Sequence, residues 1–335
     1  VGVWAVKPIR EQYLDWPGML LDSYKSGLGM VEEPLLEGSK RLVLGCGMGG
    51  SGFSLSAVEP LVGERYPFIV RKTNTPPQYL SGQDIVVAVS YSGETRETIE
   101  CLERSLEKGV ARAGGVAGRG SSLARLLSGR GLPVVEVEKK GYPRSSLAQL
   151  VGGLLALLYG GKAEGVVEEA ASLLETSRAS NEASMVAEAI YNNGEVLTPV
   201  VVSCGELGFV AERWATEFSE NAKHPALPEV YPEAGHNYIA RWHYTRGPYQ
   251  LVYIDFGGEG LCRVAKKYVL SRYPSVREPV VLDYSGLASR NKLAAVLQAA
   301  MTAGLATVEL AFKLGRNPEV IEAIDEYKHM AKGEG

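Results

Sequence analysis

The sequence predicts an α/β protein with two doubly wound parallel-sheet domains and a helical C-terminal end. The chain has 335 residues, which exceeds one ordinary compact domain and suits two of about 150 residues each. From about residue 40 onward, short apolar runs typical of buried strands alternate with longer segments typical of helices. Two segments, 42–47 and 201–205, each carry an apolar run into a glycine, which hints at a duplicated unit or arises by chance. We therefore predict domains over residues 1–160 and 161–335.

The first predicted domain contains the clearest alternation of strands and helices. Its strands are expected over residues 41–44, 67–70, 84–90, 110–116 and 133–137. Helices are expected over residues 94–106 and 145–158. Strands that alternate with helices in this way favour a parallel sheet that is covered on both faces.

The second predicted domain repeats the alternation after a linker. Residues 159–165 are expected to connect the domains, and a helix is expected over residues 166–191. Further strands are expected over 200–203, 251–256 and 280–282, with helices over 208–222 and 262–273 and two long helices at the end. The apolar run 293–312 contains Glu309, whose charge would be costly in a bilayer. We expect this run to form a packed helix that could serve a subunit interface.

Composition and charge exclude several classes of partner. Apolar residues make up 45% of the chain and charged residues 22%, which is ordinary for a soluble globular protein. The formal net charge is −4 and the isoelectric point is about 5.8, so we expect no nucleic-acid partner and no membrane partner. Residues 1–16 lack the apolar segment of a signal peptide, and we expect a cytoplasmic location.

Four cysteines are spread along the chain, at Cys46, Cys101, Cys204 and Cys262. Their spacing contains no CxxC pair, so it indicates neither a zinc site nor a dithiol motif. We expect free, buried thiols in a reducing compartment. The histidines lack metal-ligand spacing with nearby carboxylates, and no metal is expected.

A glycine-rich turn follows the first predicted strand. The run Gly45-Cys-Gly-Met-Gly-Gly-Ser-Gly52 lets the backbone turn tightly and bring its N–H groups close to an anion. It also fits the G-x-G-x-x-G pattern of dinucleotide-binding turns. That pattern needs an acidic residue about 20 positions on, whereas the second strand ends in Arg71 and Lys72. A phosphate site, an NADP site that uses Arg71 and a plain tight turn all stay open at this point.

Hydroxyl side chains follow the third predicted strand. Ser90, Ser92 and Thr95 lie within six residues at the start of a helix, where free N–H groups and hydroxyls together suit a phosphate. Simple N-capping by Ser90 or Ser92 is the alternative. In an open parallel sheet, ligands bind beyond the carboxyl ends of the strands, which is where this loop and the glycine-rich turn both lie.

Four motifs resemble a known family when they are taken together. The runs GMGGSG at 47–52 and SYSGET at 90–95 resemble the SIS (sugar isomerase) domain, whose topology is Rossmann-like or flavodoxin-like. The runs EFSENAK at 217–223 and PEAGHN at 232–237 resemble the archaeal bifunctional phosphoglucose/phosphomannose isomerases of the phosphoglucose isomerase superfamily. The resemblance extends from about residue 40 to the C-terminus. It implies two SIS-type domains.

The resemblance implies a role for each motif. The SIS loops would hold the phosphate of a sugar 6-phosphate through Gly49, Gly50, Ser51, Ser90, Ser92 and Thr95. Glu220 would be the base that moves a proton between C1 and C2, and His236 would assist ring opening. Arg144 would stabilise the enediolate, and Lys328 would lie near the substrate oxygens. No cofactor is implied, because the proton transfer needs no redox carrier.

The residues alone allow less specific interpretations. Glu220 could form a surface pair with Lys223 or His224, since it lies three and four residues before them. Arg144 could be an ordinary surface residue, and Lys328 could belong to a solvated helix face. His236 could merely begin a helix.

The function that the resemblance implies is reversible aldose–ketose isomerisation of sugar 6-phosphates through a cis-enediol. Glucose 6-phosphate and fructose 6-phosphate are the expected pair, and mannose 6-phosphate is a third candidate. In the family, a threonine in Asn-Pro-x-x-Thr accompanies acceptance of both epimers, but the matching residue here is Ile321. The family also implies a homodimer with shared active sites. The alternatives are an NADP-dependent oxidoreductase and a non-catalytic SIS-domain sugar-phosphate sensor.

Overall fold

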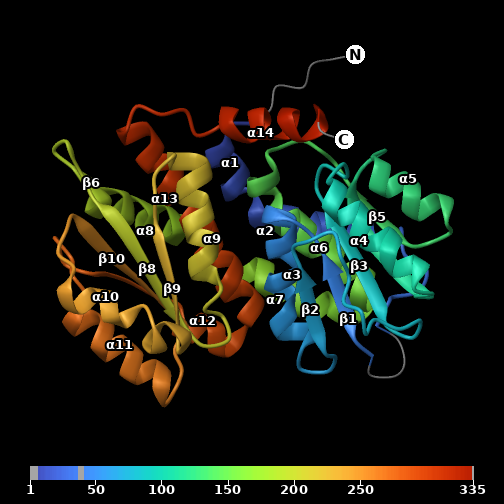
Figure 1. Ribbon diagram of the computed structural model, residues 1–335, viewed down its shortest axis with the longest axis horizontal. Coiled ribbons are helices and arrows are strands. Elements are labelled where there is room, and N and C mark those ends of the chain that lie inside the picture. Colours follow the sequence, from blue (N-terminus) through green and yellow to red (C-terminus); the bar gives the residue numbers. More distant parts are fainter. Residues whose placement is uncertain (1–6, 37–40, 334–335) are drawn as a thin grey trace. The chain divides into compact units, whose positions relative to one another are not determined.

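The computed structural model describes residues 7–36 and 41–333 (Figure 1). The chain forms two compact units. The first unit comprises Val1–Glu175 and Ser285–Gln298, and the second comprises Thr176–Tyr284 and Ala299–Gly335. The predicted division after residue 160 therefore differs from the boundaries of these units. Helix α13 (Lys292–Lys313) begins in the first unit and ends in the second.

The first unit is built on a five-stranded sheet whose strands are all parallel. Its strands are β1 (Val43–Cys46), β2 (Phe68–Arg71), β3 (Ile85–Ser90), β4 (Arg112–Gly118) and β5 (Val134–Val137). The spatial order is β2-β1-β3-β4-β5. This is the flavodoxin-like doubly wound order, and it reverses direction between β1 and β3.

Helices cover both faces of this sheet. Those that contact its strands are α2 (Trp16–Leu28), α3 (Gly49–Val62), α4 (Arg96–Glu107), α5 (Ser122–Gly129) and α6 (Leu147–Tyr159). The unit also contains α1 (Ile9–Leu14), α7 (Glu164–Leu173) and α12 (Ser285–Arg290). Short 3₁₀ turns occur at η1 (Pro143–Ser146) and η2 (Gly160–Ala163).

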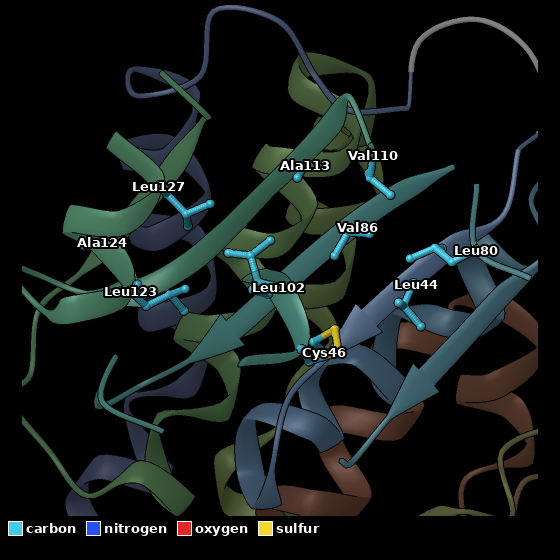
Figure 2. Close-up of a cluster of buried hydrophobic side chains, with 13 residues drawn as sticks. Leu44, Cys46, Leu80, Val86, Leu102, Val110, Ala113, Leu123, Ala124 and Leu127 are labelled. Atoms are coloured by element: carbon cyan, nitrogen blue, oxygen red, sulfur yellow. A yellow bond between two sulfur atoms is a disulfide. The ribbon is translucent and has the colours of Figure 1, made fainter. Parts of the chain in front are cut away.

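Alternation along the strands produces the two packed faces. Figure 2 shows Val86 of β3 in one buried cluster with Leu102 of α4 and Leu123 of α5. Residues one position along point the other way. A Cβ added at Gly153 of α6 would lie 3.3 Å from a methyl carbon of Val116, which indicates that α6 packs closely on the opposite face.

The second unit is built on a four-stranded parallel sheet of order β11-β10-β8-β9. The strands are β8 (Thr198–Cys204), β9 (Leu227–Tyr231), β10 (Tyr249–Asp255) and β11 (Val280–Asp283). Numbered within its own unit, this order is 2-1-3-4, which matches the first four strands of the other sheet. A two-residue hairpin, β6 (Tyr191–Asn192) with β7 (Glu195–Val196), precedes the sheet.

Helices of the second unit carry the later motifs. They are α8 (Thr176–Ile190), α9 (Val210–Glu217), α10 (Ile239–Tyr244), α11 (Leu261–Arg272) and α14 (Glu322–Gly333), with a π-helical turn η3 (Phe218–Ala222) and a 3₁₀ turn η4 (Glu233–His236). Trp242 and Tyr273 pack with Val202 in the buried cluster on one face of this sheet.

The α/β class and the parallel sheets are confirmed, and several local predictions need correction. The expected linker 159–165 is helical, because it contains η2 and the start of α7. The expected helix 166–191 is two helices, since Leu174 has extended backbone angles. Strand β9 was not predicted, because Pro228 weakens the strand signal. It lies at the sheet edge, where a proline is tolerated.

The expectation of free thiols is wrong. Cys46 pairs with Cys101 and Cys204 pairs with Cys262, with Cα–Cα distances of 6.3 and 5.6 Å. Each bond joins the last residue of a strand to a helix of the same unit. The partners are 55 and 58 residues apart in sequence, so spacing alone could not reveal them.

Among the residues that the structure describes, two helical stretches are long and apolar enough to cross a membrane by length and composition alone, at 143–173 and 292–313. Their apolar windows are 61% and 94% buried within the chain, and core helices of soluble proteins pass the same test. The expected packed helix over 293–312 is therefore confirmed. The suggestion that it forms a subunit interface is wrong, because the window is already covered by its own chain.

Candidate functional site

Four hydroxyls gather at the carboxyl ends of β1 and β3. Ser90 Oγ lies 2.9 Å from Thr95 Oγ1 and 3.4 Å from Ser92 Oγ. Ser51 Oγ accepts a hydrogen bond from the backbone N–H of Tyr91 at 3.1 Å. The sheet reverses its strand order between β1 and β3, and in doubly wound folds this position is the ligand site. The structure thus brings Ser51, Ser90, Ser92 and Thr95 together as predicted.

The backbone around these hydroxyls is shaped by glycines. Gly49 and Gly50 open helix α3, whose first-turn N–H groups have no partners within the helix. Gly49 has φ +50° and Gly93 has φ +70°, angles that residues with a Cβ rarely adopt. A Cβ at Gly52 would lie 2.7 Å from the carbonyl oxygen of Gly47, so the turn needs glycine there. Glycines thus shape the turn that places the N–H groups of α3 beside these hydroxyls.

The N-capping alternative does not describe this loop. The N-cap of α4 is Thr95, and its side chain makes no capping hydrogen bond. Ser90 Oγ and Ser92 Oγ accept hydrogen bonds from the N–H groups of Gly93 and Glu94, which precede the helix. The hydroxyls therefore organise the loop. We call Ser51, Ser90, Ser92 and Thr95 the hydroxyl cradle.

Glu94 attaches the cradle loop to α5. Its carboxylate accepts hydrogen bonds from Ser122 Oγ at 2.6 Å and from the Ser122 N–H at 3.0 Å. These bonds lower the pKa of Glu94, so the carboxylate stays ionised. The loop that follows β3 is therefore held in place by its hydrogen bonds to α5.

Arg144 lies in the same unit and is buried, with 3% of its surface exposed. Its guanidinium lies 5.1 Å from the centre of the Tyr142 ring. The surface interpretation of Arg144 is therefore wrong. Tyr91 of the cradle loop joins this region, because its hydroxyl donates to the carbonyl of Gly141 at 3.0 Å.

Gln12 supports the Arg144 segment and was missed in the sequence. Its Oε1 accepts a hydrogen bond from the Tyr142 N–H at 3.0 Å, and Trp16 Nε1 donates to the carbonyl of Ser145 at 2.7 Å. The partners are separated by 130 and 129 residues. No local pattern could have revealed these contacts.

Glu220 lies in the second unit, on the π-helical turn η3. It is half-buried and borders a hollow of about 360 Å³. The lining residues are Glu212, Ala215, Thr216, Ser219, Glu220 and Pro228. π-Helical turns inside helices occur frequently at functional sites. A carboxylate on such a turn beside a hollow suits a general base.

Lys223 ends the π-helical turn in a left-handed conformation, with φ +50°. Its Nζ donates to the carbonyl oxygens of Glu220 at 3.0 Å, Asn221 at 3.2 Å and Asn317 at 2.6 Å. The lysine thus satisfies backbone acceptors at the end of the turn. It also joins the turn to the segment before α14.

A buried ion pair in α9 supports the π-helical turn η3. Arg213 and Glu217 form it, with 3% and 1% of their surfaces exposed. Asn221 Nδ2 donates to Glu217 Oε2 at 2.8 Å and to Thr307 Oγ1 at 3.0 Å. The cluster Arg213, Glu217 and Asn221 therefore fixes the turn that carries Glu220 against α13.

His236 and Lys328 are both exposed residues of the second unit. His236 ends the η4 turn, and the next residue, Asn237, donates from Nδ2 to Glu233 Oε1 at 2.8 Å. Lys328 lies on α14. His224 Nε2 lies 3.0 Å from the Leu197 carbonyl, and burial lowers the pKa of its imidazole. His224 is thus a neutral structural residue.

Neither the possible metal ligands nor the second hollow among the described residues points to another site. Across residues 7–36 and 41–333, no group of three or more His, Cys, Asp or Glu side chains could hold a metal ion. A second hollow, of about 420 Å³, is lined by Arg246, Gly247, Arg272, Tyr273, Pro274, Ser275 and Val276. It contains none of the predicted site residues. Arg272 ends helix α11, whose negative C-terminal dipole disfavours an anion there.

Comparison with known proteins identifies the family. Residues 179–330 match the bacterial phospho-glucose isomerase C-terminal SIS domain. The bifunctional phosphoglucose/phosphomannose isomerase of Aeropyrum pernix is 32% identical over 333 residues, which cover 96% of this chain and 97% of the relative. The chain belongs to this isomerase family. A relative of the same name from Aquifex aeolicus is 32% identical over 59% of the chain and 61% of its own length.

Two further comparisons concern the fold and a relative that is named for another activity. Tagatose-6-phosphate ketose/aldose isomerase from Escherichia coli superposes with a TM-score of 0.66 at 14% identity, covering 96% of this chain and 97% of that one. At that identity the likeness shows the fold alone. A D-glucosamine-6-phosphate 4-epimerase from Sulfolobus acidocaldarius is 26% identical over 83% of this chain and 85% of its own length.

Removing the buried carboxylate of Glu217 should destabilise the protein strongly. Glu217→Ala leaves Arg213 buried without the carboxylate that Glu217 supplies, and breaking a buried pair costs about 3–5 kcal/mol. We expect a clear fall in the midpoint of urea-induced unfolding, followed by circular dichroism. Glu188→Ala, at an exposed position on α8, is the control and should change stability by less than about 0.5 kcal/mol. Equal unfolding curves for the two variants would contradict the structural role of the pair.

Proposed function

We propose that this isomerase interconverts glucose 6-phosphate and fructose 6-phosphate through a cis-enediol. The observation that carries the proposal is the hydroxyl cradle at the strand-order reversal, in a chain that belongs to the phosphoglucose/phosphomannose isomerase family. Hydroxyls and helix N–H groups suit a phosphate dianion. The cradle therefore supports a phosphorylated substrate, and the family name of the relatives supports a sugar.

The residues divide the chemistry between them. Ser51, Ser90, Ser92 and Thr95, with the amides of Gly49 and Gly50, would bind the phosphate. Glu220 would take a proton from C2 of the open-chain aldose and return it to C1. The proposed base is half-buried and borders a hollow, where a carboxylate can meet a carbon-bound proton.

Three cationic or titratable residues would assist the proton transfer. His236 would move a proton between the ring oxygen and the C1 hydroxyl during ring opening, because an imidazole can both accept and donate a proton. Arg144 would stabilise the negative oxygen of the enediolate, and its burial supports a strong electrostatic effect. Lys328 would contact substrate oxygens.

Family membership disfavours the two alternatives raised by the sequence. An NADP-dependent oxidoreductase and a non-catalytic sensor both lack support from the relatives, which are named as isomerases and an epimerase. Epimerisation of glucosamine 6-phosphate is a second candidate, since one relative covering most of the chain carries that name. A coupled assay with fructose 6-phosphate and glucose-6-phosphate dehydrogenase tests the main proposal. Chromatography of products from glucosamine 6-phosphate tests the second.

We propose a cytoplasmic location, in keeping with a phosphorylated sugar substrate. The two disulfides do not support it, because most cytosols keep thiols reduced. Cell fractionation with blocking of free thiols before lysis decides whether the bonds exist in that compartment.

Replacing the proposed base should abolish most turnover. Glu220→Gln keeps the size of the side chain but removes the proton acceptor, so we expect kcat to fall by roughly 10²–10⁴. KM should change little, because the hydroxyl cradle stays intact. Glu188→Gln, an exposed carboxamide substitution on α8, is the control and should match wild type in the coupled assay. A Glu220→Gln variant with more than a tenth of wild-type kcat would refute the assignment of the base.

Substrate breadth should depend on Ile321. This half-buried residue immediately precedes α14, and its carbonyl accepts a hydrogen bond from the Ile324 N–H at 3.1 Å. An isoleucine cannot supply the hydroxyl found in the family motif, so kcat/KM should be lower for mannose 6-phosphate than for glucose 6-phosphate. Ile321→Thr should narrow the ratio, whereas Val320→Thr next to it should not. Equal specificity constants in the wild-type protein would contradict this view.

We propose a homodimer in which each active site combines Glu220 of one subunit with His236 of its partner, as the family resemblance implies. Glu220→Ala and His236→Ala should each inactivate the pure dimer. After joint unfolding and refolding, a mixed dimer has one intact site and should recover about half of wild-type activity per dimer. Mass spectrometry confirms that mixed dimers formed. Mixed dimers without activity would show that the two residues act within one chain.

A further inference from the structure

A second buried carboxylate lies in the second unit, on strand β9. Glu229 has 1% of its surface exposed. Its Oε1 accepts hydrogen bonds from Trp242 Nε1 at 2.7 Å and from Arg241 at 3.0 Å, and its Oε2 accepts from the Tyr273 hydroxyl at 2.5 Å. Three donors from α10 and the end of α11 therefore converge on one carboxylate.

This carboxylate closes the loop that carries His236. Glu229 lies in β9, before the loop, and Trp242 lies 13 residues later in α10, after the loop. His236 lies near the middle, at the end of η4. The bonds from Arg241 and Trp242 to Glu229 therefore join the strand before the loop to the helix after it.

Further contacts hold the same loop. The Tyr231 hydroxyl lies 2.7 Å from the Tyr273 hydroxyl, so the residue two positions after Glu229 is attached to the same network. Ala234, inside η4, is 1% exposed and packs in the buried cluster with Trp242 and Tyr273. Ala234 thus anchors the η4 turn in the core, while His236 at the end of the turn is exposed.

Burying a carboxylate is costly, so its presence calls for a geometric reason. Desolvation raises the pKa of Glu229, and the hydrogen bonds from Tyr273 and Trp242 and the charge of Arg241 oppose that rise. An apolar residue of similar size often gives equal or greater stability at such a position. An apolar side chain cannot, however, hold three donors from two helices in fixed directions.

We propose that Glu229 is a positioning residue for His236: by closing the loop between β9 and α10, it holds the imidazole in the orientation needed for ring opening. The inference rests on the proposed function, in which His236 assists ring opening. It assigns to Glu229 no contact with the substrate. Misplacement of a reacting group by about 1 Å can reduce a rate by about 10²-fold.

The buried Glu217 offers a matched comparison. Both carboxylates are 1% exposed, both bond an arginine and at least one further donor, and both lie in the same unit. Glu217 supports the turn of Glu220, whereas Glu229 closes the loop of His236. The two glutamine variants should therefore slow different steps of one reaction.

An isotope effect separates these steps. The substrate is glucose 6-phosphate with deuterium at C2, and the measured quantity is the isotope effect on kcat/KM. Glu229→Gln should lower kcat/KM by about 10- to 100-fold and reduce the isotope effect toward unity, as His236→Ala should, because ring opening becomes limiting. Glu217→Gln should lower kcat/KM while keeping an isotope effect at least as large as that of wild type. A full isotope effect in Glu229→Gln would overturn the proposal.

Double substitution tests whether Glu229 acts through His236. If it does, Glu229→Gln combined with His236→Ala should be no slower than His236→Ala alone. Multiplicative losses would overturn the proposal. Circular dichroism establishes that each variant is folded at the assay temperature. Should Glu229→Gln fail to fold, Tyr273→Phe removes one donor with little change in packing and should show the same isotope signature with a smaller loss.

A measurement without turnover distinguishes this inference from the proposed function. In proton–carbon spectra of histidine-labelled protein, the His236 signal, assigned with His236→Ala, should broaden or split in Glu229→Gln but not in Glu217→Gln. An unchanged His236 signal would overturn the positioning role whatever the substrate is. A wild-type protein that fails to convert fructose 6-phosphate would instead defeat the proposed function alone.

Discussion

The parallel pairing of β1 with β3 is the constraint on which the candidate site depends. Because Cys46 pairs with Ala88 in a parallel register, both strands end at the same edge of the sheet. The strand order reverses there, so the following loops diverge to opposite faces. The first turn of α3 and the loop before α4 nevertheless meet, because the Tyr91 N–H donates to Ser51 Oγ at 3.1 Å. Moving either strand by one residue would turn its inward side chains outward and separate the cradle.

Buried charges have a comparable role in the second unit. Its sheet has one strand fewer, and the proposed catalytic residues Glu220 and His236 lie on short, irregular turns. Such turns have few main-chain hydrogen bonds to define their shape. Glu217 and Glu229 compensate by collecting donors from neighbouring elements, so that side-chain polarity replaces regular backbone pairing as the source of order. The same carboxylates make these turns sensitive to substitutions that never contact the substrate.

Much of the site could be predicted because its signals are local. The loop of Ser90 to Thr95 and the glycines at 49 and 50 follow strands within a few residues, and both periodicity and turn chemistry are visible in a short window. Supporting residues are different. Gln12 reaches a backbone N–H 130 residues away, and nothing near it in sequence indicates that partner.

Charged residues were the hardest to assign. Glu217, Glu229 and Arg144 carry charges that are typical of a protein surface, yet each is almost fully buried. A sequence pattern reports hydrophobic periodicity, whereas burial of a charge depends on partners supplied by other elements. Pro228 indicated that no strand forms at β9. The rule against proline in strands does not apply there, because β9 lies at the edge of its sheet.

The paired cysteines have a consequence for the unfolded chain. Each disulfide closes a covalent ring within one unit, spanning 55 or 58 residues, and none of the four cysteines connects the two units. In the chain-entropy description, a ring of this size removes about 4 kcal/mol of conformational freedom from the denatured ensemble. When the packing of a unit is lost, its disulfide therefore still links the first strand of the sheet to a helix that follows it. After heating, each ring therefore restricts the unfolded chain of its own unit alone.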